Sequence, residues 1–104
     1  TYVDNAIQAN LAAMSRESQF GFEVMNIACG ERMSVNDLFK NLQASLSKYI
    51  PEVSKIEVIH SGEREGDILH SHADISKAKE LIDYEVLVGV EAGLQYTVDW
   101  FMRD

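Results

Sequence analysis

Cysteine, positive charge and long apolar runs are all scarce in this 104-residue chain. The single cysteine, Cys29, excludes an internal disulfide and is typical of a reducing compartment, so we expect a cytoplasmic location. Nine basic residues against seventeen acidic ones give a net charge of -8, which argues against nucleic acid or an anionic membrane as a partner. No apolar run approaches the roughly 20 residues that a membrane span needs.

Several motifs that hold cofactors or catalytic groups are also missing. Neither G-x-G-x-x-G nor G-x-x-x-x-G-K-[ST] occurs, so the glycine-rich phosphate loops of dinucleotide-binding and P-loop folds are absent. No tyrosine is followed four positions later by a lysine, the spacing at which an ammonium group lowers a phenol pKa for proton transfer. Cys29 has no obvious histidine partner in sequence, and we interpret it as a structural residue.

The apolar residues, 46% of the chain, are spaced as in a mixed fold. Ser34 and Asp37 have the spacing of a capping box, Pro51 stops the helix that they open, and Asp74 is expected to cap a later helix. Helices are predicted over residues 2–15, 33–51, 73–84 and 89–104, and short alternating strands over residues 22–30 and 55–60. The predicted fold class is therefore α/β: one small domain, residues 1–104, with about four helices and two to three short strands.

The run "HSGEREGD" could form a nucleotide-binding loop. Gly66 allows a tight turn, Arg64 can offer a planar fork to a phosphate, and Asp67 can accept hydrogen bonds from vicinal sugar hydroxyls. A cation and a carboxylate at this spacing suit a diphosphate joined to a ribose. The alternative is a solvated surface turn in which Arg64 and Asp67 pair loosely, at less than ~1 kcal/mol.

The next run, "HSHAD", has a metal-binding alternative. His70, His72 and Asp74 alternate, so on a strand they would share one face and could bind zinc. Ile75 stands where the H-x-H-x-D-H pattern of zinc hydrolases needs a further histidine, so we expect no metal site. On this interpretation the histidines decorate an exposed segment and Asp74 caps a helix.

Four stretches in order carry a family resemblance: "YVDNAIQANLAA", "FEVMNIACGERMSVNDLF", "REGDILHSHADISKAKELIDYE" and "VEAGLQYTVDWF". Together they resemble the C-terminal substrate-binding portion of nucleotide-sugar 4-epimerases of the extended short-chain dehydrogenase/reductase family. The resemblance implies a C-terminal nucleotide-sugar-binding domain cut from a longer protein, without the Rossmann half.

The resemblance also assigns roles to three residues. It implies that Arg64 binds the UDP diphosphate and that Asp67 contacts the ribose. Ser71 matches a position that varies with the sugar, where a small side chain leaves room for an acetamido group. The substrate implied is therefore UDP-N-acetylglucosamine or a related UDP-hexose.

For the whole protein, the resemblance implies an NAD-dependent isomerase that is a homodimer. The catalytic residues and the NAD site would lie in the missing Rossmann half, so this segment alone is expected to be inactive and to bind no cofactor. Two alternatives stay open. The segment could come from a nucleotide-sugar dehydratase, decarboxylase or reductase, or it could be a free-standing protein-interaction module that uses its apolar helix faces.

Overall fold

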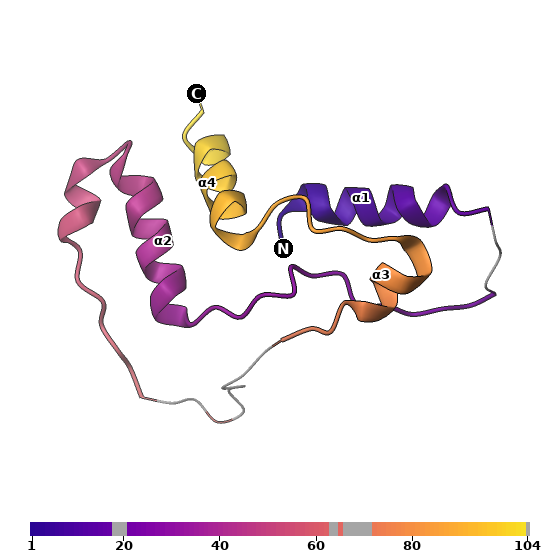
Figure 1. Ribbon diagram of the computed structural model, residues 1–104. Helices are drawn as coiled ribbons and strands as arrows, with labels where there is room; N and C mark the ends of the chain where they lie inside the picture. The colour runs from indigo at the N-terminus through magenta and orange to yellow at the C-terminus, as the bar shows by residue number, and fades with distance from the viewer. Residues whose placement is uncertain (18–20, 63–64, 66–71, 104) are drawn as a thin grey trace. The chain divides into compact units, whose positions relative to one another are not determined.

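The computed structural model describes residues 1–17, 21–62, 65 and 72–103 (Figure 1). The described residues form α1 (Val3–Met14), α2 (Val35–Ser47), the 3-10 helix η1 (Pro51–Lys55), α3 (Ser76–Ile82) and α4 (Val90–Phe101). They divide into two compact units: unit 1 is Thr1–Glu31 with His72–Gly93, and unit 2 is Arg32–Ser71 with Leu94–Asp104. None of the described helices is long and apolar enough to span a membrane.

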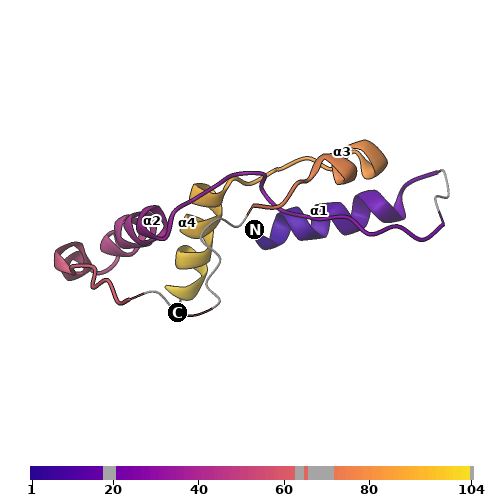
Figure 2. The same cartoon turned by 90° about the horizontal axis from the view of Figure 1, so that it is seen from below.

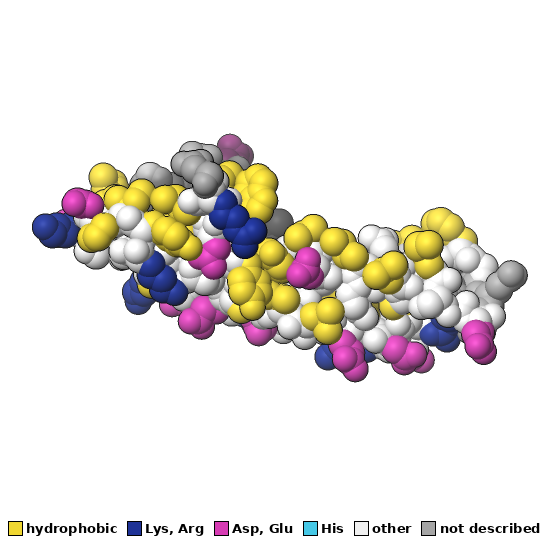
Figure 3. Space-filling view, turned by 90° about the horizontal axis from the view of Figure 1, so that it is seen from above, with side chains coloured by type: hydrophobic (Ala, Val, Ile, Leu, Met, Phe, Trp, Pro, Cys, Tyr) yellow, Lys and Arg dark blue, Asp and Glu magenta, His cyan; other side chains and the backbone are white. Residues whose placement is uncertain are grey.

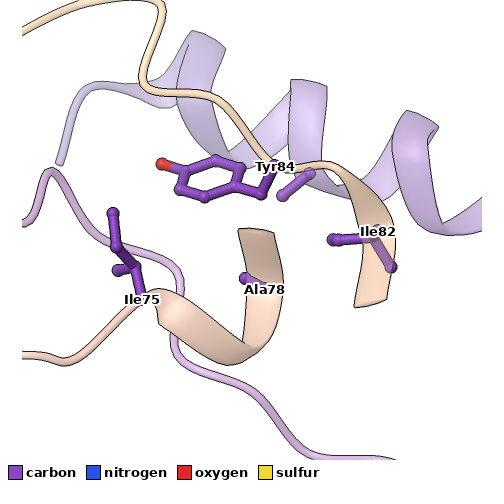
Figure 4. Packing of buried hydrophobic residues seen from close by; sticks show 5 residues of the cluster. Ile75, Ala78, Ile82 and Tyr84 are labelled. Atoms are coloured by element: carbon purple, nitrogen blue, oxygen red, sulfur yellow. The ribbon is translucent and has the colours of Figure 1, made fainter. Parts of the chain in front are cut away.

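Unit 1 is built around α1 and α3, which lie side by side in both views (Figure 1 and Figure 2). Its core contains Ile75, Ala78 and Ile82, with Tyr84 next to α3 and Ala9 from α1 (Figure 4). The extended segment of residues 22–30 adds partly buried side chains to this cluster, among them Met25, Ile27 and Ala28. Unit 1 thus has a small core, made by the start of the chain and a segment that follows much later.

The end of α3 directs Tyr84 into that core. Asp83 takes a left-handed φ of 53° and ends the helix, and the Tyr84 N–H reaches back to the Ala78 carbonyl at 3.2 Å. The Asp83 N–H donates to the same Ala78 carbonyl, so this oxygen accepts both bonds that close the end of α3. The Tyr84 hydroxyl then donates to the carbonyl oxygen of Ala28 at 2.7 Å.

Unit 2 contains α2, η1 and most of α4. The side-chain amide of Gln43 on α2 donates to the carbonyl of Val53 at 3.0 Å and to that of Ile56 at 2.7 Å, so it ties η1 to α2. Tyr49 donates its hydroxyl to the Asp99 carboxylate at 2.7 Å, and Gln95 donates to the same carboxylate at 2.6 Å. Side-chain hydrogen bonds therefore link the segments of this unit.

The four predicted helices are confirmed, and so is the capping box. The Asp37 N–H donates to the Ser34 hydroxyl at 3.0 Å, and that hydroxyl donates to the Asp37 carboxylate at 2.6 Å. The N-cap of α3 is Ile75 and not Asp74 as predicted, but the Asp74 carboxylate accepts the N–H of Ser76, the first residue of the helix, at 2.9 Å. Helix α2 ends at Ser47, and the predicted last turn before Pro51 is instead a break that leads into η1.

The predicted α/β fold class is wrong, because the described residues form no strand. A strand needs a neighbour to take up its backbone groups. Residues 22–30 and 55–60 instead give carbonyls to side chains: Ala28 accepts from Tyr84, and Ile56 accepts from Gln43. Within the first run Phe22 is 90% exposed, whereas Met25 and Ile27 contact the core.

Candidate functional site

The three predicted ligand contacts, Arg64, Asp67 and Ser71, lie outside the described residues, and so does His70. The structure does describe the residues on both sides of them. The preceding flank belongs to unit 2 and the following flank, from His72 on, belongs to unit 1.

The preceding flank is held by α2 through Gln43. Besides its bonds to the Val53 and Ile56 carbonyls, the Gln43 amide lies 3.5 Å from the Ser54 carbonyl. One side chain of α2 therefore contacts three backbone carbonyls at the point where the chain leaves the helical part of unit 2. From Ile56 to Gly62 the chain is irregular and its residues are exposed. An extended, solvated segment thus leads from α2 and η1 to the predicted loop.

The following flank is fixed in unit 1 by two polar contacts. His72 Nε2 lies 3.1 Å from the carbonyl oxygen of Gly30 and acts as the donor to it. Asp74 accepts from both the N–H and the hydroxyl of Ser76, and the Asn26 amide donates to the Asp74 carbonyl at 3.3 Å. His72 and Asp74 therefore connect the end of the predicted loop to α3 and to the segment of residues 22–30.

A hollow of about 390 Å³ lies beside this second flank. Its lining combines the backbone around His72 with one flexible cation, Lys79 of α3. The residues that surround it are Cys29, Gly30, His72, Ala73, Asp74, Ile75, Ser76 and Lys79. This lining is mixed, with polar side chains from His72, Asp74, Ser76 and Lys79 and apolar ones from Cys29, Ala73 and Ile75.

The zinc alternative needs His70, which lies outside the described residues, so it stays untested. The Nε2 atom of His72 is occupied by the Gly30 carbonyl, and the carboxylate of Asp74 by Ser76. Within the ranges that the structure describes, histidine, cysteine and acidic side chains form no cluster of three that could hold a metal ion. The contacts of His72 and Asp74 are structural ones.

Asn5 is a central residue that the periodicity of the sequence did not identify. It is fully buried in α1, and its side chain bonds to the segment before α4. Its Nδ2 donates to the Val88 carbonyl at 2.7 Å, and its Oδ1 accepts the N–H groups of Leu87 and Val88 at 3.0 Å. Asn5 lies nearly opposite the apolar stripe of this helix, so hydrophobic periodicity gave no signal for it.

Cys29 takes part in the same contacts and is structural, as interpreted from the sequence. Asn5 Nδ2 donates to the Cys29 sulfur at 3.7 Å, and the thiol lies 3.7 Å from the Val88 carbonyl. Burial raises the pKa of the nearby Tyr84 hydroxyl, and the proximity of Cys29 raises this pKa further. A phenol whose pKa is raised keeps its proton and donates to the Ala28 carbonyl, so these groups hold unit 1 together and are not set for proton abstraction.

Comparison with known proteins indicates what the whole chain resembles. No protein-family model matches it. It is 30% identical over 101 residues, 96% of its length, to a UDP-glucuronate 4-epimerase of Thermodesulfobacterium geofontis, of which it covers 28%. It is 28% identical over 99% of its length to a putative UDP-glucose 4-epimerase of Methanocaldococcus jannaschii, of which it covers 30%.

A third relative has a different reaction in its name. The chain is 29% identical over 97% of its length to a UDP-N-acetyl-alpha-D-glucosaminuronate decarboxylase of Bacillus cytotoxicus, of which it covers 31%. This chain is similar to nucleotide-sugar epimerases and decarboxylases. It spans under a third of the length of each of these relatives. The family resemblance read from the sequence is thereby supported at this coarser level.

Proposed function

We propose that this chain is the nucleotide-sugar-binding portion of an NAD-dependent UDP-hexose or UDP-N-acetylhexosamine 4-epimerase. It holds the UDP group, so that the sugar is positioned for oxidation and reduction at C4 by the rest of the protein. The single observation that carries this proposal is the similarity to UDP-sugar enzymes over at least 96% of the chain.

Three residues of the 60–72 segment are assigned to the ligand. Arg64 pairs with the diphosphate through a planar, charge-assisted fork, and Asp67 accepts hydrogen bonds from the ribose hydroxyls. Ser71 lies beside the sugar, where its small side chain leaves room for an acetamido group.

The reaction itself is assigned to the remaining polypeptide. Bound NAD supplies the hydride acceptor and donor there, and the sequence of this chain has no glycine-rich dinucleotide loop to hold it. Binding energy from the UDP group, remote from the reacting carbon, keeps the sugar in place while it is oxidised and reduced. The 104-residue chain is therefore expected to bind UDP weakly and to show no epimerase activity.

The test is an amide NMR titration of the labelled chain with UDP. We expect binding in the millimolar range, about 4 kcal/mol, because only part of the pocket is present. Chemical-shift changes should concentrate between His60 and Ser76, and Arg64→Ala should abolish them. Arg32→Ala, at an exposed arginine of the same unit, is the matched control and should leave the UDP response unchanged.

Two outcomes would contradict this assignment. Equal loss of the UDP response in Arg64→Ala and Arg32→Ala would mean that general charge, and not a diphosphate site, attracts the nucleotide. Chemical-shift changes on addition of zinc, centred on His70 and His72, would indicate a metal site and not a nucleotide-binding loop. If the proposal holds, the rates at which the whole protein turns over a UDP-hexose and a UDP-N-acetylhexosamine would identify its substrate.

A second candidate function is supported by the relative named as a decarboxylase. Such a protein would bind the same UDP handle but act on a sugar with a C6 carboxylate. Carbon dioxide release from a UDP-uronic acid by the whole protein would identify this reaction, whereas epimerisation without gas release would identify the first.

A further inference from the structure

Helix α1 presents apolar side chains on the side that unit 1 does not cover. Its four large apolar residues remain exposed: Val3 by 57%, Ile7 by 50%, Leu11 by 59% and Met14 by 81%. At about 100° per residue, this stripe lies nearly opposite the buried face of Asn5 and Ala9. Unit 1 therefore packs on the face of α1 opposite this stripe.

The composition of α1 is also unusual for a helix with an exposed side. Asp4 is its only charged residue. Surface helices usually carry a charged face opposite their apolar one. The polar residues of α1 besides Asp4 are uncharged: Asn5, Gln8 and Asn10. Figure 3 shows hydrophobic side chains along α1 on this face of the molecule.

A groove of about 660 Å³ runs along one edge of the stripe, within unit 1. Apolar side chains of α1, α3 and the following segment line it: Ile7, Leu11, Ala12, Ile82 and Leu87. Polar side chains complete the lining: Asp4, Gln8, Ser15, Arg16 and Asp83. The stripe and the groove together form a continuous site that we call the α1 face.

The relatives indicate what covers the α1 face. Each of them matches almost this whole chain, yet the chain spans only 28–31% of their length, so more than two thirds of each polypeptide lies outside the matched region. A second copy of this chain is a weaker candidate, because two chains with a net charge of -8 each repel one another.

We propose that the α1 face is the surface on which the remainder of a longer polypeptide packs, through an apolar helix or sheet face of its own. This inference rests on the proposed function, since it takes the chain to be one portion of such a polypeptide. Within that polypeptide α1 is an interior helix, buried on the Asn5 side by unit 1 and on the Leu11 side by the remaining domain.

The test uses the longest natural polypeptide that contains this sequence, compared with the 104-residue chain. Amide hydrogen exchange of α1, without nucleotide, should be slower in the longer polypeptide by about tenfold or more. Leu11→Gln should remove this protection in the longer polypeptide and leave exchange in the 104-residue chain unchanged. Leucine and glutamine have similar helix propensities, so the comparison reports packing and not helix formation.

Ala13→Gln is the matched control. Ala13 is exposed and lies four residues after Ala9, on the side of α1 away from the stripe, so this variant should leave exchange unchanged in both proteins. The proposal is overturned if the natural polypeptide has only these 104 residues, or if Leu11→Gln and Ala13→Gln act alike in the longer one. The proposal is also overturned if sedimentation of the longer polypeptide at pH 7 shows a dimer that the Leu11→Gln substitution dissociates. In that case a second copy, and not the remaining domain, would cover the α1 face. Exchange without nucleotide is independent of UDP titration, so either proposal can fail alone.

Discussion

Asn5 stabilises unit 1 through one buried amide that bonds to the segment before α4. Asn5→Ala would leave the Leu87 and Val88 N–H groups and the Val88 carbonyl without this partner. Losing a buried or partly buried hydrogen-bond partner costs about 1–3 kcal/mol, so urea unfolding of the variant should show a loss of that size.

The control for this substitution is Asn10→Ala on the same helix. The Asn10 side chain is exposed and donates only to the carbonyl of Ala6, one turn earlier, at 3.0 Å. Its removal should change the free energy of unfolding by no more than about 0.5 kcal/mol. Similar losses in the two variants would mean that the Asn5 contacts do not stabilise unit 1.

Sequence reasoning at the residue scale identified caps better than core positions. Ser34 and Asp37 act locally, as partners three residues apart, so spacing alone predicted them. Asn5 acts on residues 82 and 83 positions later, and hydrophobic periodicity has no signal for a polar residue in a core. The assignments of Arg64, Asp67 and Ser71 remain predictions, because these residues lie outside the described ranges.

At the scale of elements, the cap of α2 gives a pH-dependent prediction. The hydrogen bond from the Ser34 hydroxyl lowers the pKa of Asp37 below its ordinary value of 3.8. The folded chain then binds fewer protons than the unfolded chain near this pH. The contribution of Asp37 to stability is therefore full above pH 3.8 and is lost as the pH falls through the lowered pKa of the folded state.

Ser34→Ala tests this directly. Carboxyl NMR titration should show the pKa of Asp37 rising toward 3.8 in the variant, because the hydroxyl donor is gone. Asp74, whose pKa is lowered mainly by a hydrogen bond from Ser76, is an internal control and should keep its lowered value. An unchanged Asp37 pKa would mean that the cap does not hold the carboxylate.

The elements also show why the helices were predictable and the strands were not. A helix satisfies its backbone within a single segment, so residues 33–51 were enough to predict α2. An alternating run becomes a strand only if a second strand pairs with it, and that partner is not encoded locally. Residues 22–30 are extended yet unpaired, and side chains such as Tyr84 take up their carbonyls.

At the scale of the whole molecule, exposed apolar side chains coexist with a large negative charge. Met14 is 81% exposed, Phe22 90%, Val35 81% and Ile59 94%. Side chains of this kind favour association, whereas a net charge of -8 opposes it. The balance between the two should depend on pH and on salt.

We predict that self-association increases as the pH falls from 7 to about 5, because carboxylates with pKa values near 4 begin to take up protons. Light scattering at low ionic strength measures this. Salt of about 0.5 M at pH 7 should act in the same direction, since it screens repulsion between chains. Far-UV circular dichroism at each pH separates association from unfolding. Constant scattering with intact helices would mean that charge is not what keeps these apolar surfaces apart.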